Sequence, residues 1–280
     1  MHRVLLVCHA TATAGLGHLS RLLALAQALR KDGRVQPVFL IIGDPIEKKE
    51  LTSFNTNFLP LSDNLVTSVK NYVELHKSEV VVFDLFPMKD FVIDLGDLFI
   101  CLSERNIRMV GVDSLLEHCD VLDLIWMPSF HFDTSKHADC KSILKSGWDS
   151  FLIQKRLPSR AWKKGSRVLV LTGGGDVTRL GTTLPTQIDT LLNEQLEIHW
   201  VKGPYSDAPS LPEKPRLSWS IHNAPTQLDE LIVQSDYVLT VFGVSFFEVL
   251  QYGVPTVVFS PYGNKDNSEL IALAEEGVAA

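Results

Sequence analysis

The sequence predicts an α/β protein made of two Rossmann-like domains that face a cleft. Short apolar runs, suited to strands buried in a parallel sheet, alternate with segments of helical period along the chain. A strand that runs into a glycine turn occurs twice, at Val4–Cys8 and again at Val168–Leu171. Residues 235–280 read as strand, helix, strand, helix, with the turns at the carboxyl ends of the strands, where open parallel sheets bind ligands.

The first predicted domain covers residues 1–157. We expect its strands at Val4–Cys8, Val35–Ile42, Val80–Phe83 and Met109–Val112. We expect helices between them at Gly17–Lys31, Asn64–His76 and Phe91–Arg105. The region Leu115–Arg160 reads as irregular, which is typical of the late loops and linker of a first domain.

The second predicted domain covers residues 166–280 and follows a polar, basic crossing at Pro158–Ser166. We expect strands at Val168–Leu171, Glu197–Val201, Leu217–Ile221 and Tyr237–Val241, with helices at Leu184–Asn193 and Thr226–Val233. A helix that stops at Gly253, a strand from Pro255 and a helix that ends at Gly277 complete the pattern.

Composition and charge narrow the function classes. The chain has 280 residues, of which 45% are hydrophobic and 21% charged, as in ordinary globular proteins. The net charge of −7 argues against a nucleic-acid partner. It gives no overall attraction to an anionic membrane, so a peripheral membrane contact would need a local basic or apolar patch. The apolar run after Met1 is too short for a signal peptide, and Cys8 and Cys101 read as reduced core residues, so we expect a cytoplasmic protein.

The turn after the first strand carries the first candidate site. Gly15 and Gly17 let the backbone fold tightly and let a ligand approach it closely. His18 stands at the start of the following helix, where a histidine can exchange a proton near neutral pH. Arg21 lies one turn further on and suits a phosphate or a carboxylate. The alternative is a plain glycine turn with a capping histidine.

Two acids follow later strands of the first domain. Asp84 is placed to assist a base or to bind an acceptor hydroxyl. Asp113 occupies a similar position, and for Asp113 we favour a strand-end cap. The other histidines lack the HxH or HxxxH spacing of metal ligands, so we expect neither a metal nor a cofactor.

Glycine turns also mark the second domain. Gly173, Gly174 and Gly175 suit a turn that wraps a diphosphate with backbone N–H groups, although a plain tight turn fits as well. Asp176 would repel phosphate and reads as a helix cap or as a partner of a hydroxyl group. The Gly243–Ser245 turn, which includes Val244, opens a helix that carries Glu248.

The C-terminal half resembles the nucleotide-binding half of two-domain GT-B glycosyltransferases, and most of all the transferases that add N-acetylglucosamine to the lipid-linked peptidoglycan precursor. The resemblance rests on small residues followed by Glu248, the Gly253-Val254-Pro255 turn, and a polar turn before the last helix. It implies that Glu248 holds the ribose of a UDP-sugar and that the Gly243–Ser245 turn lies against the pyrophosphate. It further implies roles for three groups of residues: Gly173–Gly175 in the donor site, the backbone of Ile221 and His222 at the uracil ring, and Asn264, Asp266 and Asn267 at the donor sugar.

This chain departs from that family at two places. The family commonly has a glutamine pair or Asn-Gln where this chain has Asn267-Ser268-Glu269, which leaves the donor sugar open. In the family more residues follow the position of Gly277, so we expect a fragment or a form without the closing helix.

The first glycine loop resembles a second group. Gly15-Leu16-Gly17-His18 with Arg21 is similar to the first loop of the nucleotide-sugar hydrolase of pseudaminic acid synthesis and of related spore-coat polysaccharide proteins. That resemblance implies that His18 helps to activate water. Leu22 and Asn267-Ser268 differ from residues that those hydrolases often carry.

Four functions follow as hypotheses. The first is a metal-independent transferase of cell-surface glycan synthesis, which moves a sugar, an amino sugar by resemblance, from UDP to an acceptor hydroxyl. His18 is its candidate base, Asp84 its support, and a lipid-linked glycan is one candidate acceptor. The second is a UDP-sugar hydrolase with the same site. A non-catalytic nucleotide-sugar-binding protein and a UDP-sugar epimerase are the third and fourth.

Overall fold

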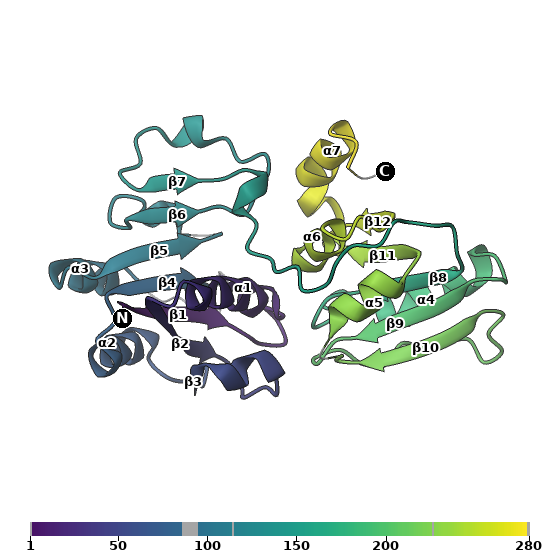
Figure 1. The fold of residues 1–280 in the computed structure, drawn as a ribbon, viewed down its shortest axis with the longest axis horizontal. Helices are drawn as coiled ribbons and strands as arrows, with labels where there is room; N and C mark the ends of the chain where they lie inside the picture. The colour runs from purple at the N-terminus through teal and green to yellow at the C-terminus, as the bar shows by residue number, and fades with distance from the viewer. Residues whose placement is uncertain (1, 86–94, 114, 226, 279–280) are drawn as a thin grey trace. The chain divides into compact units, whose positions relative to one another are not determined.

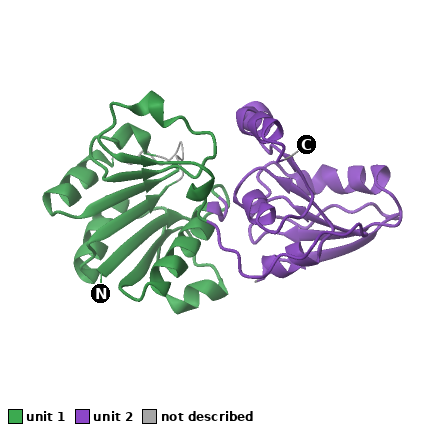
Figure 2. Cartoon of the chain, turned by 45° about the horizontal axis from the view of Figure 1, so that its top comes forward, with its two compact units in different colours: residues 1–14, 18–152 green, residues 15–17, 153–280 purple. Residues whose placement is uncertain are grey.

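The computed structural model describes residues 2–85, 95–113, 115–225 and 227–278. The chain divides into two compact units, one of residues 1–14 and 18–152, the other of residues 15–17 and 153–280 (Figure 2). The segment Pro158–Ser166, expected as the crossing between the domains, belongs to the second unit and makes hydrogen bonds within it. Arg160 pairs with Asp236 at 2.7 Å, and the indole of Trp162 donates to the carbonyl oxygen of Asp236 at 2.8 Å.

The first unit contains a seven-stranded sheet in which every recorded pairing is parallel (Figure 1). Its strands are β1 (His2–His9), β2 (Val35–Ile42), β3 (Asn55–Leu59), β4 (Val80–Asp84), β5 (Arg108–Val112), β6 (Leu124–Trp126) and β7 (Ile143–Lys145). Their order across the sheet is β3-β2-β1-β4-β5-β6-β7. The chain therefore reverses its direction of growth between β1 and β4, which lie side by side.

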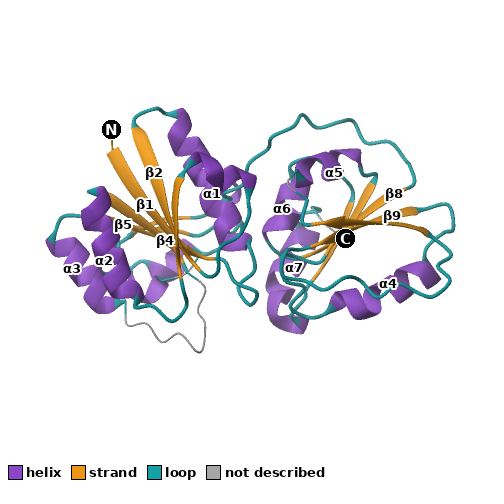
Figure 3. Ribbon diagram, turned by 90° about the horizontal axis from the view of Figure 1, so that it is seen from below, coloured by secondary structure: helices purple, strands orange, loops and turns teal. Residues whose placement is uncertain are grey.

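Helices cover both faces of this sheet. Alternate residues of a strand point to opposite faces, so the apolar runs bury both sides. Leu5 and Val7 pack with the apolar residues of α2 (Leu65–His76) and α3 (Gly96–Glu104). Figure 3 shows α1 (Gly17–Lys31) on the opposite side of the sheet, and its Leu19, Leu22 and Leu23 are buried. The first residues of the expected helix Phe91–Arg105 lie outside the described part of the chain.

Two expectations for the first unit were wrong. Leu115–Arg160 is not wholly irregular, because it contributes β6 and β7, and Cys119 and Cys140 form a disulfide between the loops that flank β6. Each of these strands has only three residues, too few to show a periodic pattern. β3 was also missed, because three of its five residues are polar, as an edge strand permits.

The second unit contains a five-stranded sheet, again with parallel pairings. Its strands are β8 (Arg167–Leu171), β9 (Glu197–Lys202), β10 (Ser218–Asn223), β11 (Tyr237–Val241) and β12 (Thr256–Phe259), in the order β10-β9-β8-β11-β12. Its helices are α4 (Leu180–Leu191), α5 (Leu228–Gln234), α6 (Val244–Leu250) and α7 (Asn267–Glu275). α4 packs on one face of the sheet, and α5 and α6 pack on the other.

Short 3-10 turns complete both units, at Lys49–Ser53, Leu116–His118, Thr134–His137, Trp148–Ser150 and Gly263–Asp266. Among the described residues, no helix combines the length and apolar character needed to cross a membrane.

α4 begins earlier than the sequence suggests. The expected helix was Leu184–Asn193, whereas α4 spans Leu180–Leu191 and so contains Gly181 and Pro185, which both disfavour a helix interior. Pro185 lacks an N–H and cannot bond to the carbonyl oxygen of Gly181. The backbone N–H of Ser210 donates to that oxygen instead, at 2.7 Å, so the proline leaves no unsatisfied acceptor in the helix.

Candidate functional site

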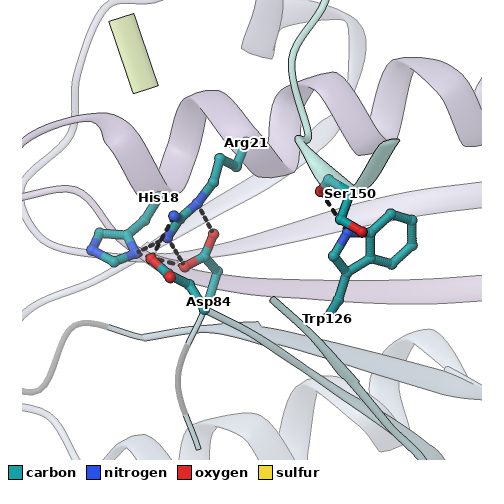
Figure 4. A network of polar contacts seen from close by, with 6 residues as sticks. His18, Arg21, Asp84, Trp126 and Ser150 are labelled. Carbon is teal, nitrogen blue, oxygen red and sulfur yellow. Dashed lines mark hydrogen bonds and ion pairs between the residues drawn. The ribbon is translucent and has the colours of Figure 1, made fainter. Parts of the chain in front are cut away.

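The first unit brings His18 and Asp84 together at the point where the strand order reverses. β1 leads into the loop before α1, whose second residue is His18, and β4 ends at Asp84. Cys8 of β1 lies opposite Asp84 in the sheet register. His18 Nδ1 lies 2.6 Å from Asp84 Oδ1 (Figure 4). The side chain of Asp84 is fully buried, and that of His18 is 11% exposed.

This contact determines how the imidazole of His18 can act. An ionised carboxylate only accepts hydrogen bonds, so Nδ1 carries the proton and donates it to Asp84. In the neutral ring, Nε2 then keeps the lone pair that can take a proton. Figure 4 shows that the second ring nitrogen points away from Asp84. The arrangement is that of a histidine oriented by an acid to serve as a general base.

Arg21 joins the two acids of the first unit. Its Nε donates to Asp84 Oδ2 at 2.9 Å and one terminal nitrogen donates to Oδ1 at 2.7 Å. The other terminal nitrogen donates to Asp113 Oδ2 at 2.6 Å. The sequence indicated that Arg21 suits a carboxylate, and the structure pairs it with both acids. The preference for Asp113 as a strand-end cap stays a prediction.

Asp84 stays ionised in spite of its burial. Burial alone would raise the pKa of its carboxyl group, but the Arg21 guanidinium and the hydrogen bond from His18 outweigh burial and hold the pKa below its ordinary value. Burial likewise opposes the charge of Arg21, yet Asp84 and Asp113 raise its pKa further above its usual range. The partner of His18 is therefore a permanent negative charge near neutral pH.

His9, the last residue of β1, is a buried neighbour of this site that the sequence did not single out. Burial, followed by the charge of His18, lowers the pKa of His9 from 6.5 to about 4, while Asp84 opposes the shift. Between pH 4 and 6.5, His9 is therefore mostly neutral in the folded protein and mostly protonated in the unfolded chain.

We expect His9 to make stability depend on pH between about 4 and 6.5. In this window the unfolded chain binds more protons at His9, so the free energy of unfolding rises with pH, by about 3 kcal/mol across the window. His9→Asn should flatten this rise in urea titrations made at several pH values. His131→Asn, at an exposed histidine of the same unit, should leave it unchanged. An equally steep rise in the His9 variant would contradict the assignment.

In the second unit, the two expected phosphate-facing turns follow neighbouring strands. Gly173–Gly175 follows β8 and Gly243–Ser245 follows β11, and these strands pair with each other. Gly173 and Gly243 have φ angles of +87° and +148°, which only glycine adopts without strain. Asp176 caps α4, because its carboxylate accepts from the N–H groups of residues 180 and 181 at 2.9 and 2.8 Å. This is one of the two readings that the sequence offered for Asp176.

Gly203 supports the first of these turns, and the sequence did not reveal its role. A Cβ atom at Gly203 would lie 2.3 Å from the carbonyl oxygen of Gly174 and 2.6 Å from that of Gly173. The backbone N–H of Tyr205 also donates to the Gly174 oxygen, at 3.0 Å. The loop after β9 therefore packs directly against the Gly173–Gly175 turn.

We expect Gly203→Ala to displace that turn, because the backbone atoms that the new methyl group meets cannot rotate away. Overpacking of this kind costs on the order of 1–3 kcal/mol of the free energy of unfolding. NMR spectra should show shifted backbone amide resonances for Gly173–Gly175 in the variant, and denaturation should show the loss of stability. Unchanged resonances and stability would contradict the packing described.

The remaining candidate residues of the second unit spread along the carboxyl edge of its sheet. Glu248 lies half-buried on α6, after the Gly243–Ser245 turn. Ile221 and His222 lie in the edge strand β10, where the His222 ring stacks on His199, with 3.0 Å between their nitrogens.

The last polar turn lies after β12, near the other edge of the sheet. It includes Asn264 and Asp266, and Asn267 begins α7. Ser260 Oγ donates to Asp266 Oδ2 at 2.6 Å, so Asp266 helps to shape this turn. The described residues include no group of three or more histidine, cysteine or acidic side chains placed to hold a metal ion.

The two parallel-sheet units define the GT-B fold. The fold of MurG from Acinetobacter baumannii is similar, with a TM-score of 0.62 and 16% identity over 100% of this chain and 85% of that one. UGT2 of Phytolacca americana, solved with UDP-2fluoro-glucose and pterostilbene, gives a TM-score of 0.58 and 13% identity over 93% of this chain and 80% of that one. A protein of Listeria monocytogenes described as a putative UDP-N-acetylglucosamine 2-epimerase gives a TM-score of 0.57 and 12% identity over 92% of this chain and 79% of that one. At these identities the likeness concerns the fold.

Sequence comparison adds one distant relative. No family model matches the chain. The uncharacterized protein MJ1062 of Methanocaldococcus jannaschii is 23% identical over 276 residues. The alignment covers 91% of this chain and 55% of the relative, so this chain spans about half of the relative's length. The likeness to MurG fits the resemblance of the C-terminal half, while the resemblance of the first loop to the pseudaminic-acid hydrolase stays a prediction.

Proposed function

We propose that this chain is a nucleotide-sugar enzyme, and specifically a glycosyltransferase that moves a sugar from UDP to an acceptor hydroxyl. The observation that carries the proposal is the His18–Asp84 pair, held by Arg21 at the strand reversal of the first unit. Open parallel sheets bind ligands at such reversals. A histidine oriented by a buried acid suits a reaction that must remove a proton from a hydroxyl group.

In the proposed reaction, Nε2 of His18 accepts the proton of the acceptor hydroxyl. The acceptor oxygen forms a bond to the anomeric carbon of the donor, the bond from that carbon to the phosphate oxygen breaks, and UDP leaves with the electron pair. Asp84 stabilises the imidazolium that forms, because the carboxylate already accepts the Nδ1 proton. Arg21 keeps Asp84 ionised and fixed in place.

The second unit would hold the donor. We assign the pyrophosphate to the Gly173–Gly175 and Gly243–Ser245 turns, which follow paired strands, and the ribose to Glu248. The backbone of Ile221 and His222 would contact the uracil, and the turn of Asn264, Asp266 and Asn267 would contact the sugar. Solved proteins of similar fold support a nucleotide donor, since MnaA of S. aureus was solved with UDP and UGT2 with UDP-2fluoro-glucose.

The test is incubation of the intact protein with a panel of UDP-sugars, followed by NMR, first alone and then with cell-derived acceptors. The proposal expects UDP-sugar to bind and to stay intact until an acceptor is added. Release of UDP and free sugar in equal amounts without an acceptor would instead make the protein a hydrolase. Interconversion of one UDP-sugar into another would make it an epimerase, an activity named among the similar structures. Binding without turnover under every condition would leave a non-catalytic nucleotide-sugar-binding protein.

A further inference from the structure

Asp113 lies beside the proposed catalytic pair, and the reaction above gives it no role. It follows β5 at the carboxyl edge of the first sheet, one strand away from Asp84 at the end of β4. Its N–H donates to the carbonyl oxygen of Trp126 at 2.9 Å, and its carboxylate accepts from a terminal nitrogen of Arg21 at 2.6 Å. The side chain of Asp113 is 43% exposed, whereas that of Asp84 is fully buried.

The negative charge of Asp113 exceeds what Arg21 needs. Asp84 contacts two nitrogens of Arg21, at 2.9 and 2.7 Å, so this one buried acid already balances the charge of the buried guanidinium. Asp113 adds a second carboxylate, which leaves one net negative charge on the group of three side chains. The half-exposed acid therefore has charge and hydrogen-bonding capacity to offer to a ligand.

One oxygen of the Asp113 carboxylate remains for such a ligand. Arg21 bonds to Oδ2, and within the described part of the chain no group donates to Oδ1. A carboxylate oxygen accepts two hydrogen bonds, so Oδ1 can receive hydroxyl groups in place of water. The contact with Arg21 already holds the carboxylate in one orientation, so binding costs little further conformational entropy.

Asp113 and His18 contact the same guanidinium group. One terminal nitrogen of Arg21 bonds to Asp113, and the other lies 3.1 Å from His18 Nδ1. Because the guanidinium is a small planar group, the Asp113 carboxylate lies within about 8 Å of the His18 ring. A single sugar ring that reaches both residues with two of its hydroxyl groups spans such a distance.

We propose that Asp113 binds the acceptor, by accepting a hydrogen bond from a hydroxyl group next to the one that reacts. This inference rests on the proposed transferase function and names the acceptor class, a sugar ring with at least two neighbouring hydroxyl groups. The negative charge would repel the diphosphate of the donor, and it disfavours an acceptor with a carboxylate or a phosphate at that position. The site therefore selects an uncharged polyhydroxyl acceptor.

The binding test needs no donor. The uniformly ¹⁵N-labelled protein is titrated with the methyl glycosides of glucose, galactose, mannose and N-acetylglucosamine, and the backbone amide resonance at position 113 is followed. We expect at least one glycoside to shift this resonance saturably. Asp113→Asn should bind the same glycoside on the order of tenfold more weakly, because it loses a charge-assisted hydrogen bond. Asparagine tolerates the left-handed φ of +63° found at Asp113, so this variant keeps the backbone.

Asp32→Asn is the matched control. Asp32 also pairs with an arginine, Arg34, at 2.8 Å, and its side chain is 39% exposed. It precedes β2 and so lies at the opposite, amino edge of the sheet. This variant should bind the glycosides as tightly as the unchanged protein does.

Monodeoxy analogues of the bound glycoside separate ligand binding from a structural role of Asp113. One analogue should bind the unchanged protein about tenfold more weakly than the parent glycoside, because it lacks the hydroxyl group that Asp113 accepts from. Asp113→Asn should bind that analogue and the parent glycoside with similar affinity, since the contact is already lost. A structural role predicts instead that the variant loses the same factor with every analogue.

Four results would overturn the proposal. They are no shift with any glycoside, equal affinity in Asp113→Asn, an equal loss with every deoxy analogue, or tighter binding of methyl glucosaminide, whose ammonium group would then be the ligand. The thermal unfolding midpoint of each variant shows whether it is folded.

The outcome is separable from that of the donor experiment. If glycosides bind at Asp113 but no UDP-sugar is consumed, the transferase function fails and the sugar site remains. If sugar transfer occurs and Asp113→Asn leaves the KM of the acceptor unchanged, the sugar site fails alone.

Discussion

His18→Ala is expected to lower the turnover of UDP-sugar by about 10²–10⁴-fold, the usual contribution of a general base. The variant loses the only atom, Nε2, that we assign to the transfer of the acceptor proton, while the glycine turns of the second unit stay intact. UDP affinity, measured by calorimetry, should therefore change little as the rate falls. That separation between binding and rate identifies a catalytic role.

His131→Ala is the matched control, since His131 is an exposed histidine of the same unit. It should turn over UDP-sugar at the rate of the unchanged protein, because no step of the proposed reaction is assigned to His131. A His18 variant that retains full turnover would remove the histidine from the mechanism. A parallel loss of rate and UDP affinity would indicate a structural role.

Asp84→Asn is expected to lower the free energy of unfolding by about 3–5 kcal/mol, because it leaves the buried guanidinium of Arg21 without its main counter-charge. Asp113 compensates only in part, since its side chain is 43% exposed and contacts one nitrogen of Arg21. Urea denaturation of the variant and of the unchanged protein measures the difference. Glu74→Gln, at the exposed pair of Glu74 with Arg105, should have little effect.

The pH dependence of the free energy of unfolding is a second test of the role of Asp84. The pKa of Asp84 is lower in the folded protein than in the unfolded chain, so the unfolded chain binds the proton first as the pH falls. The stabilisation is complete above the unfolded pKa of about 4 and is lost as the pH falls through the folded value. The stability difference between the variant and the unchanged protein should shrink in that acidic range.

A double-variant cycle tests the coupling directly. Arg21→Met combined with Asp84→Asn removes both charges, so the combined loss should be clearly smaller than the sum of the two single losses. Additive losses would show that Arg21 and Asp84 do not depend on each other.

Much of the fold could be predicted from the sequence, since strands buried on both faces must be apolar along their length. Runs such as Val35–Ile42 and Tyr237–Val241 therefore appear in the structure at the residues expected. The glycines, His18, Arg21 and Asp84 stood out because each follows a strand and occurs where a ligand-binding edge was expected. The strands β6 and β7 have three residues each and gave no such pattern. They form because β6 pairs with β5 and β7 pairs with β6.

The amino-acid order alone thus determined the alternation of elements and the residue types at the strand ends, because both depend on local sequence. Only the tertiary structure decided which of those residues meet. Arg21 reaches Asp84 and Asp113 across 63 and 92 positions of sequence, and His9 becomes a neutral neighbour of the site through burial. Gly203, in the loop after β9, contacts the Gly173–Gly175 turn. Such contacts depend on strand order and on the space between packed elements, which no local pattern of residues records.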